Sequence, residues 1–201
     1  MALKQQFDFT QDMILENDRV LLRPLISTDI EFLKIYVQNE PEIWTYSLVA
    51  IRDKDDLGNY IESAIEARKN KTAYAFIVFD KILQQYVGCT RFYDIQLSFA
   101  STQLGYTWYS KKVWGTGVNT HCKFLLLQFA FDQIGFKRVE FRADNDNKRS
   151  IAAMQKMGCT IEGILRSHLP KPDGTRRDSI VLSILQKEWQ EKVKENIKNQ
   201  L

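Results

Sequence analysis

The chain has 201 residues, of which 44% are hydrophobic and 26% are charged, and its formal net charge is +3. This length and composition predict one folded domain over residues 1–201 and exclude disordered chains and small disulfide-stapled scaffolds. The small net charge gives no argument for a nucleic-acid partner, and no apolar run reaches the ~18 residues of a membrane span. Three cysteines without a spaced pair and no export signal predict a cytoplasmic protein with free thiols, and we expect no metal site.

The first half of the chain predicts a strand, two helices and three further strands. Residues 20–24 form a short strand that stops at its proline. The sequence Thr-Asp-Ile-Glu at 28–31 predicts a capping box at the start of a helix, and a second helix is expected to begin near Asp55. Apolar alternation predicts the three strands, the first two of them joined in a hairpin, over 74–79, 86–95 and 103–109.

Helices and strands alternate in the second half. A glycine-containing loop at 111–118 leads into an apolar helix that stops at Gly135. The later elements are a strand at 138–143, a helix at 147–157, strands at 161–169 and 178–185, and a terminal helix bearing Trp189, Val193, Ile197 and Leu201. This order predicts an α/β (α+β) fold in which helices flank a mixed sheet of about seven strands.

The loop at 111–118 has features of an anion-binding site. The start of a helix offers unpaired backbone N–H groups and a positive dipole end, and Gly115 and Gly117 let the backbone approach phosphate oxygens closely. Basic side chains also outnumber acidic ones over residues 71–201. An ordinary tight turn is the alternative. Thr120 stands where a dinucleotide fingerprint needs its third glycine, and no Gly-Lys-Ser/Thr is present, which argues against hydride carriers and P-loop NTPases.

Two blocks in this order resemble a known superfamily. Lys112, Gly115 and Gly117 form Lys-x-x-Gly-x-Gly at the head of a helix, and Asn147-x-x-Ser150 opens the next helix. They resemble the GNAT superfamily of acetyl-CoA-dependent N-acetyltransferases, whose loop motif is Gln/Arg-x-x-Gly-x-Gly/Ala. Smaller motifs resemble more closely the ribosomal-protein N-terminal acetyltransferase subfamily; they are residues 105–110, Asn119-Thr120, Asp173-Gly174 and Arg177-Asp178.

The resemblance implies a GNAT-like, V-splayed sheet with acetyl-CoA as the acetyl donor in the gap between two strands. Main-chain groups at the edge of the first strand would pair with the pantetheine arm, the loop would hold the pyrophosphate, and two asparagines would reach the pantetheine amides. Asn147 is equally suited to capping its own helix. The implied cofactor-binding residues are Trp108, Tyr109, Ser110, Lys112, Val113, Trp114, Gly115, Thr116, Gly117, Val118, Asn119, Asn147 and Ser150.

Acetyl transfer to an amine needs a donor for the departing thiolate. Many GNAT enzymes carry a tyrosine seven residues after the asparagine, but this chain has Met154 there, which cannot donate a proton. Resemblance to the ribosomal subfamily implies Ser150 in its place, at the positive end of the helix. The alternative is a serine that only caps its own helix.

The chemistry also needs a base for the attacking amine. Glu140 lies in a Glu-x-Arg-Ala run that resembles the ribosomal subfamily, and the alternative is a surface salt bridge with Arg142 on the same strand face. His168 is a second candidate because an imidazole titrates near neutrality. The subfamily's nearby glutamate is replaced by Leu169, and a water chain without a single base is a third account. His121 is expected to be structural.

These observations predict an acetyl-CoA-dependent N-acetyltransferase acting on a primary amine, either a protein N-terminus or a small amine. A non-catalytic acyl-CoA-binding module is the alternative, in which Met154 and the missing glutamate mark lost chemistry. The expected partners are acetyl-CoA and the amine acceptor, with no nucleic acid and no membrane, and a homodimer is left open.

Overall fold

An eight-stranded sheet lies at the centre of this computed structural model, which describes residues 7–201. Its spatial order is β1-β2-β3-β4-β5-β6-β8-β7. The mixed α/β fold predicted from the sequence is confirmed, and the additional strand is β1, only two residues long. The strands are β1 Leu15–Glu16, β2 Val20–Pro24, β3 Ala73–Asp80, β4 Gln85–Gln96, β5 Ser101–Tyr109, β6 Arg138–Asp144, β7 Thr160–Pro170 and β8 Arg176–Leu185.

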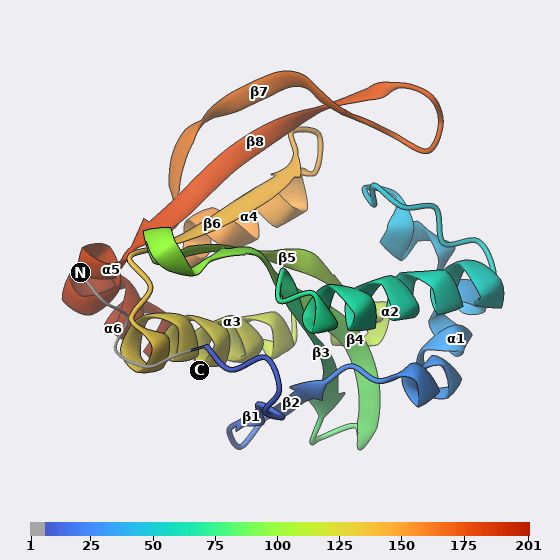
Figure 1. The fold of residues 1–201 in the computed structure, drawn as a ribbon, viewed down its shortest axis with the longest axis horizontal. Coiled ribbons are helices and arrows are strands. Elements are labelled where there is room, and N and C mark those ends of the chain that lie inside the picture. Colours follow the sequence, from blue (N-terminus) through green and yellow to red (C-terminus); the bar gives the residue numbers. More distant parts are fainter. Residues whose placement is uncertain (1–6) are drawn as a thin grey trace.

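Helices cover both faces of the sheet (Figure 1). On one face, apolar residues of α1 and α2 pack on β3 and β4, as Leu33, Ile61 and Ile77 show. On the other face, α3, α4 and the C-terminal helix bury Leu126, Met154 and similar side chains. No helix within residues 7–201 has the length and apolar character needed to cross a membrane. The helices are α1 Ile30–Asn39, α2 Lys54–Lys69, α3 Val118–Gln128, α4 Lys148–Met157, α5 Gln186–Glu188 and α6 Lys194–Lys198.

Strands β5 and β6 form the parallel pair of the sheet, and they separate soon after they meet. Their register covers only residues 101–103 of β5 and 138–140 of β6, while the other neighbouring strands run antiparallel. Figure 1 shows β6 rising away from β5 beyond this point, together with the long β7–β8 hairpin. The backbone of β5 after Gln103 therefore has no strand partner on its β6 side. This opening is the V that the resemblance implied.

A β-bulge interrupts β5 beside the opening. Cys89 of β4 lies opposite Trp108, but Arg91 lies opposite Gly105, so β5 contains an extra residue between the two pairs. Tyr106 absorbs the irregularity with a φ of +50°, in the left-handed region that side chains other than glycine rarely adopt. The bulge turns main-chain groups of β5 out of the normal ladder at the position where β6 has left.

The predicted capping box at 28–31 is wrong. Thr28 lies in a short 3₁₀ turn, and α1 begins at Ile30. The residue that organises this end is Asp29, which is buried, forms a 2.6 Å ion pair with Arg23 and accepts a hydrogen bond from the backbone of Ile26. Glu31 instead pairs with lysines on the surface. A long-range ion pair has thus overridden a local capping pattern.

Two predictions about helices in the C-terminal half can be compared with the structure. One is the helix end at Gly135, and the other is the apolar stripe of the terminal helix. Gly135 adopts a φ of +86° after a π-helical turn that extends α3, so the predicted stop is confirmed. In the terminal helix, Trp189, Val193 and Ile197 are buried as expected. Leu201 lies beyond the helix end and is 44% exposed, so its predicted place in the apolar stripe is wrong.

A lysine is buried beneath the bulge. Lys123 of α3 is only 5% exposed, and its Nζ donates to Thr107 Oγ1 at 2.8 Å and to Thr90 Oγ1 at 3.4 Å. Its partners are hydroxyl groups rather than carboxylates, and burial lowers the pKa of Lys123 to about 8. The amine of Lys123 therefore links α3 to β4 and β5. Burying its charge costs electrostatic free energy.

Lys123→Met should change how stability depends on pH. In the wild type the native state releases the Lys123 proton near pH 8, whereas the unfolded chain holds it to about pH 10.4. The free energy of unfolding of the wild type should therefore rise relative to Lys123→Met between these values, by at most about 1.4 kcal/mol per pH unit. Denaturant unfolding from pH 7 to pH 10 measures this difference. A difference that stays constant over that range would contradict the buried, proton-releasing amine.

Candidate active site

The loop at 111–118 is fastened to the end of β5. The Trp114 indole Nε1 donates to the carbonyl of Tyr109 at 3.0 Å, and Thr116 Oγ1 donates to the carbonyl of Val113 at 2.8 Å. Val113 is buried in the core on the α3 side of the sheet. These contacts fix the loop as it passes from the open edge of β5 into α3.

The entry into α3 leaves backbone donors free. Gly115 and Gly117 both adopt positive φ, +75° and +89°, as the sequence led us to expect of a phosphate-binding loop. Among residues 7–201 no acceptor is found for five backbone N–H groups, those of Gly115, Gly117, Val118, Asn119 and Thr120. Lys112 is exposed in the same loop. Free N–H groups, a helix dipole and a nearby cation together suit a phosphate.

The three residues expected to line the cofactor at the end of β5 have buried side chains. Trp108 packs against Trp44, with ring centroids 4.6 Å apart, and Tyr109 packs under α3. Ser110 donates from Oγ to Glu40 at 2.9 Å and is fully buried, so its hydroxyl holds the end of α1 against the loop. Their side chains are therefore packed in the core, and what they can offer a ligand is the main chain of β5.

Two residues at the start of α4, Asn147 and Ser150, play different parts. Asn147 Oδ1 accepts from the backbone N–H of Ser150 at 3.1 Å, so Asn147 caps the helix. The Ser150 Oγ makes no hydrogen bond within residues 7–201, so the alternative that Ser150 caps its own helix is wrong. Met154 is buried in the core. Ser150 is thus a partly exposed hydroxyl in the first helical turn, without a structural partner.

A cation–π contact joins the segment that follows β5 to the segment that follows β6. The Arg149 guanidinium carbon of α4 lies 3.4 Å from the centroid of the Trp114 ring. Trp114 follows β5 and Arg149 follows β6, so the contact spans the open end of the V. Such contacts contribute about 0.5–1 kcal/mol at exposed sites, which is small enough to break when a ligand enters.

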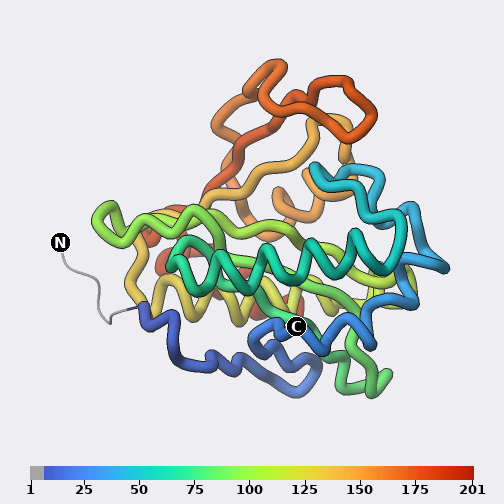
Figure 2. The backbone as a smooth tube through the Cα atoms, turned by 45° about the vertical axis from the view of Figure 1, so that its right-hand side comes forward, coloured from blue at the N-terminus to red at the C-terminus, as the bar shows by residue number. Residues whose placement is uncertain are grey.

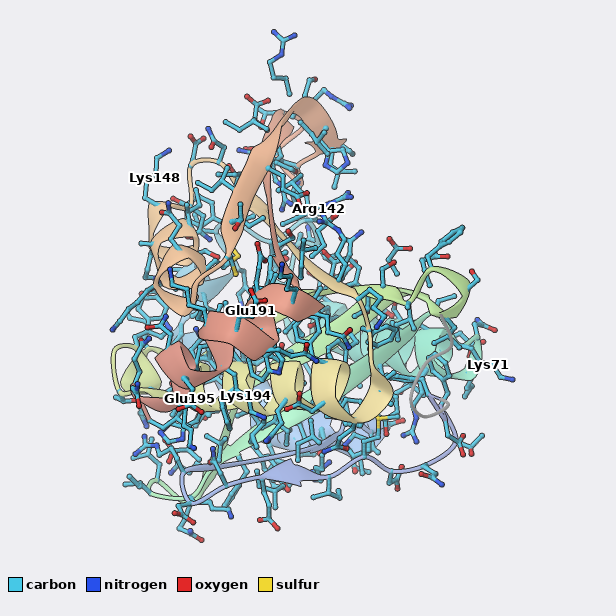
Figure 3. All side chains as sticks on the ribbon, turned by 90° about the vertical axis from the view of Figure 1, so that its left-hand side faces the viewer. Lys71, Arg142, Lys148, Glu191, Lys194 and Glu195 are labelled. Atoms are coloured by element: carbon cyan, nitrogen blue, oxygen red, sulfur yellow. The ribbon has the colours of Figure 1, made fainter. Side chains whose placement is uncertain are left out.

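Glu140 forms salt bridges. The sequence offered this as the alternative to a role as the catalytic base. Its Oε1 accepts from Arg142 Nε at 2.7 Å and its Oε2 from Arg138 Nη2 at 2.8 Å. Arg138 also pairs with Glu162, so four side chains alternate in charge across β6 and β7. Figure 3 shows Arg142 on the opposite side of the hairpin from Lys148 of α4, on the face that no helix covers. Both carboxylate oxygens of Glu140 are therefore occupied.

His168 lies near the far end of β6. Its Nδ1 is 3.0 Å from Ser179 Oγ, and Ser179 is the register partner of Asp144. Burial lowers the pKa of His168, and the guanidinium groups of Arg142 and Arg177 lower it further. A neutral imidazole at pH 7 is the form that can accept a proton.

The other histidine, His121, occupies a structural position. Its Nδ1 lies 3.1 Å from the side-chain amide of Asn17, which ties the N-terminal segment to α3. Burial and the charge of Arg19 lower the pKa of His121. This contact agrees with the structural role that the sequence predicts for His121.

A pocket of about 430 Å³ opens beside the end of β6. It lies between the connection at 45–52 and the β7–β8 turn, which approach each other in both Figure 1 and Figure 2. Asp144 at its wall is paired with Lys171 at 3.1 Å. Asp144 is followed directly by the turn that leads into α4, the helix on which Ser150 lies.

Several features of the site were missed from the sequence. The bulge at Tyr106 has no local signal, because tyrosine does not favour a left-handed conformation. Arg177 was noted only as part of a motif, and Arg91 was not noted. Both are buried without a carboxylate partner, which depends on residues distant in the chain.

Comparisons of the sequence agree with this architecture. The chain is 23% identical over 172 residues to the uncharacterized N-acetyltransferase YoaA of Bacillus subtilis (strain 168), with 86% of this chain and 96% of that protein covered. YdaF of the same strain, named as a candidate ribosomal N-acetyltransferase, is 24% identical over 180 residues, with 87% and 95% covered.

Solved structures and a family model extend the comparison. A GCN5-related N-acetyltransferase from Brucella melitensis matches with a TM-score of 0.86 at 23% identity, covering 96% of this chain and 86% of that one. The self-immunity acetyltransferase MccE, solved with acetyl-CoA and AMP, matches at 0.75 and 23%, covering 84% and 93%. The model of the acetyltransferase (GNAT) domain matches residues 19–160. With most of its length matched in this way, the chain belongs to the GNAT family of acetyltransferases.

Proposed function

We propose that this acyltransferase moves an acetyl group from acetyl-CoA to a primary amine, either a protein N-terminus or a small amine. The observation that carries the proposal is the set of free N–H groups where the glycine loop enters α3, at the mouth of the β5–β6 opening. These groups suit the pyrophosphate of acetyl-CoA, and the unpaired edge of β5 suits its pantetheine amides. The pocket lined by Asp144 and Arg177 would take the amine.

The reaction is a direct transfer. The neutral amine nitrogen attacks the thioester carbonyl carbon, the new C–N bond forms, and the C–S bond breaks to release CoA. Main-chain N–H groups at the bulge of β5 are suited to stabilise the oxygen that gains negative charge. The Ser150 hydroxyl donates to the departing thiolate. His168 takes the proton that the amine loses, because both oxygens of Glu140 are held by arginines.

We further propose one acetyltransferase domain over residues 1–201 and the cytoplasm as its compartment. Three buried free thiols, Cys89, Cys122 and Cys159, support a reducing compartment. Release of free CoA thiol in the presence of an amine is the primary test. An acyl-CoA-binding module without catalysis would bind acetyl-CoA but release no thiol with any amine.

Gly115→Ala should weaken acetyl-CoA binding, and Gly174→Ala is its matched control. Both glycines have positive φ, +75° and +84°, and an added Cβ would meet no protein atom within 4 Å at either. Both variants should therefore lose a similar roughly 1–2 kcal/mol of stability. Only Gly115→Ala should raise the Kd for acetyl-CoA, by at least about tenfold or 1.4 kcal/mol, measured by calorimetry. Equal affinities of the two variants for acetyl-CoA would show that the loop is not part of the acetyl-CoA site.

Ser150→Ala should lower kcat by about 10–10³-fold while acetyl-CoA still binds. A donor to the thiolate acts mainly as negative charge builds on sulfur, so its loss falls on turnover rather than on affinity. Because Asn147 supplies the helix cap, the melting temperature should stay close to that of the wild type. Turnover equal to wild type would overturn the proposed role of Ser150.

The pH dependence should identify the base. With His168 as base, kcat/KM rises with pH through a pKa below the ordinary 6.5, since protonation below that value removes the acceptor. His168→Gln should abolish this acidic limb, whereas Glu140→Gln and His121→Gln should keep it. Loss of the limb in Glu140→Gln alone would make Glu140 the base. A limb that survives all three substitutions would support the water chain.

A further inference from the structure

The pocket beside β6 contains a buried arginine that lacks an anion. Arg177 is 7% exposed and lines the pocket. Its Nε donates to Ser179 Oγ at 2.8 Å, but within residues 7–201 its Nη1 and Nη2 have neither a hydrogen-bond acceptor nor a salt bridge. Asp144, the carboxylate whose charge acts on Arg177, has one oxygen on Lys171 and accepts from the backbone N–H of Asp146 with the other.

The charge of Arg177 is costly in this position. Burial lowers the pKa of Arg177 and Arg142 lowers it further, whereas Asp144 raises it. A guanidinium nevertheless stays protonated in proteins, so it cannot escape the cost by losing its proton. Nη1 and Nη2 of Arg177 are not among the fully buried unpartnered atoms, and Arg177 lines the pocket, so a bound anion could reach them there. Such an anion would compensate the charge that burial makes costly.

Two further side chains, Trp44 in the pocket wall and Arg91 of β4, have buried polar atoms without a partner within residues 7–201. The Trp44 Nε1 is buried without an acceptor, and Trp44 lines the same pocket. Arg91 of β4 is 6% exposed, and its Nε and Nη2 are buried without a partner. Arg91 lies over the rings of Tyr106 and Tyr60, 4.3 and 5.2 Å from their centroids, beside the bulge of β5. The acceptor side of the sheet thus carries uncompensated positive charge and a spare donor.

We propose that the acceptor is an amine that also carries a carboxylate, and that Arg177 binds this carboxylate. The inference rests on the proposed function and names the class of its acceptor. The two free Nη groups form a planar fork that fits both oxygens of a carboxylate. The volume of the pocket, about 430 Å³, suits a small molecule or the first residues of a peptide. A carboxylate held there leaves the amine end to reach the opening beside Ser150.

Paired amines that differ only in the carboxylate test the proposal. We would compare β-alanine with β-alaninamide and γ-aminobutyrate with its amide, and peptides beginning with Asp with those beginning with Asn. Thiol release gives kcat/KM, referred to the unprotonated fraction of each amine. The wild type should prefer the carboxylate member by at least about tenfold. A preference among the small amines or among the peptides identifies the source of the carboxylate.

Arg177→Gln should reduce this preference to within about twofold, and Arg177→Lys, which keeps the charge but loses the fork, should fall between the two. Arg176→Gln is the matched control, because Arg176 is the exposed neighbour that bonds to Ser167 and does not line the pocket. It should keep the preference of the wild type. Equal turnover of acid and amide by the wild type, or a preference that survives Arg177→Gln, would overturn the proposal.

Binding measured without turnover separates this inference from the proposed function. Calorimetry compares N-acetyl-β-alanine with N-acetyl-β-alaninamide on the wild type and on Arg177→Gln. Tighter binding of the acid, lost in Arg177→Gln, supports the carboxylate site even where no amine releases thiol and the proposed transfer is wrong. Equal binding of acid and amide to the wild type would contradict the carboxylate site even where turnover is observed.

Discussion

The brief parallel pairing of β5 with β6 is the constraint on which the site depends. Because the two strands share only three register pairs, the main chain of β5 is left without a partner on one side. The segments that follow the two strands are then held apart at the open end, the glycine loop on one arm and α4 on the other. At the bulge, where β6 has left, Lys123 of α3 donates a hydrogen bond to Thr107 and so holds the irregular part of β5 in place.

The two faces of the sheet carry different kinds of side chain. Helices α3 and α4 bury one face with apolar side chains, and α1 and α2 cover part of the other. The part of β6, β7 and β8 that no helix covers carries charged side chains instead. There Glu140 is neutralised by Arg138 and Arg142, whereas Arg177 has no carboxylate of its own. The carboxylate-bearing acceptor that we propose rests on this uneven pairing of charges.

Elements with a strong apolar period were predictable from the sequence, and so was the loop. The stretch at 111–118 shows its backbone conformation locally, because the two glycines that adopt positive φ and the helix that follows can both be recognised in the sequence. The start of α1 was not predictable, because Asp29 is fixed by Arg23 from another element. The role of Ser110 was equally hidden, since its hydroxyl binds Glu40, seventy residues earlier in the chain. Such features depend on tertiary contacts that local patterns do not contain.

Because Arg149 stacks on Trp114, the fluorescence of Trp114 can report on the state of the opening. Of the four tryptophans, Trp44, Trp108 and Trp189 are buried, while Trp114 is partly exposed. Indole fluorescence is sensitive to a nearby cation and to water, so separation of Arg149 from Trp114 would alter the emission of Trp114. If acetyl-CoA enters this opening as we propose, its entry can be followed by intrinsic fluorescence, without a label and without turnover.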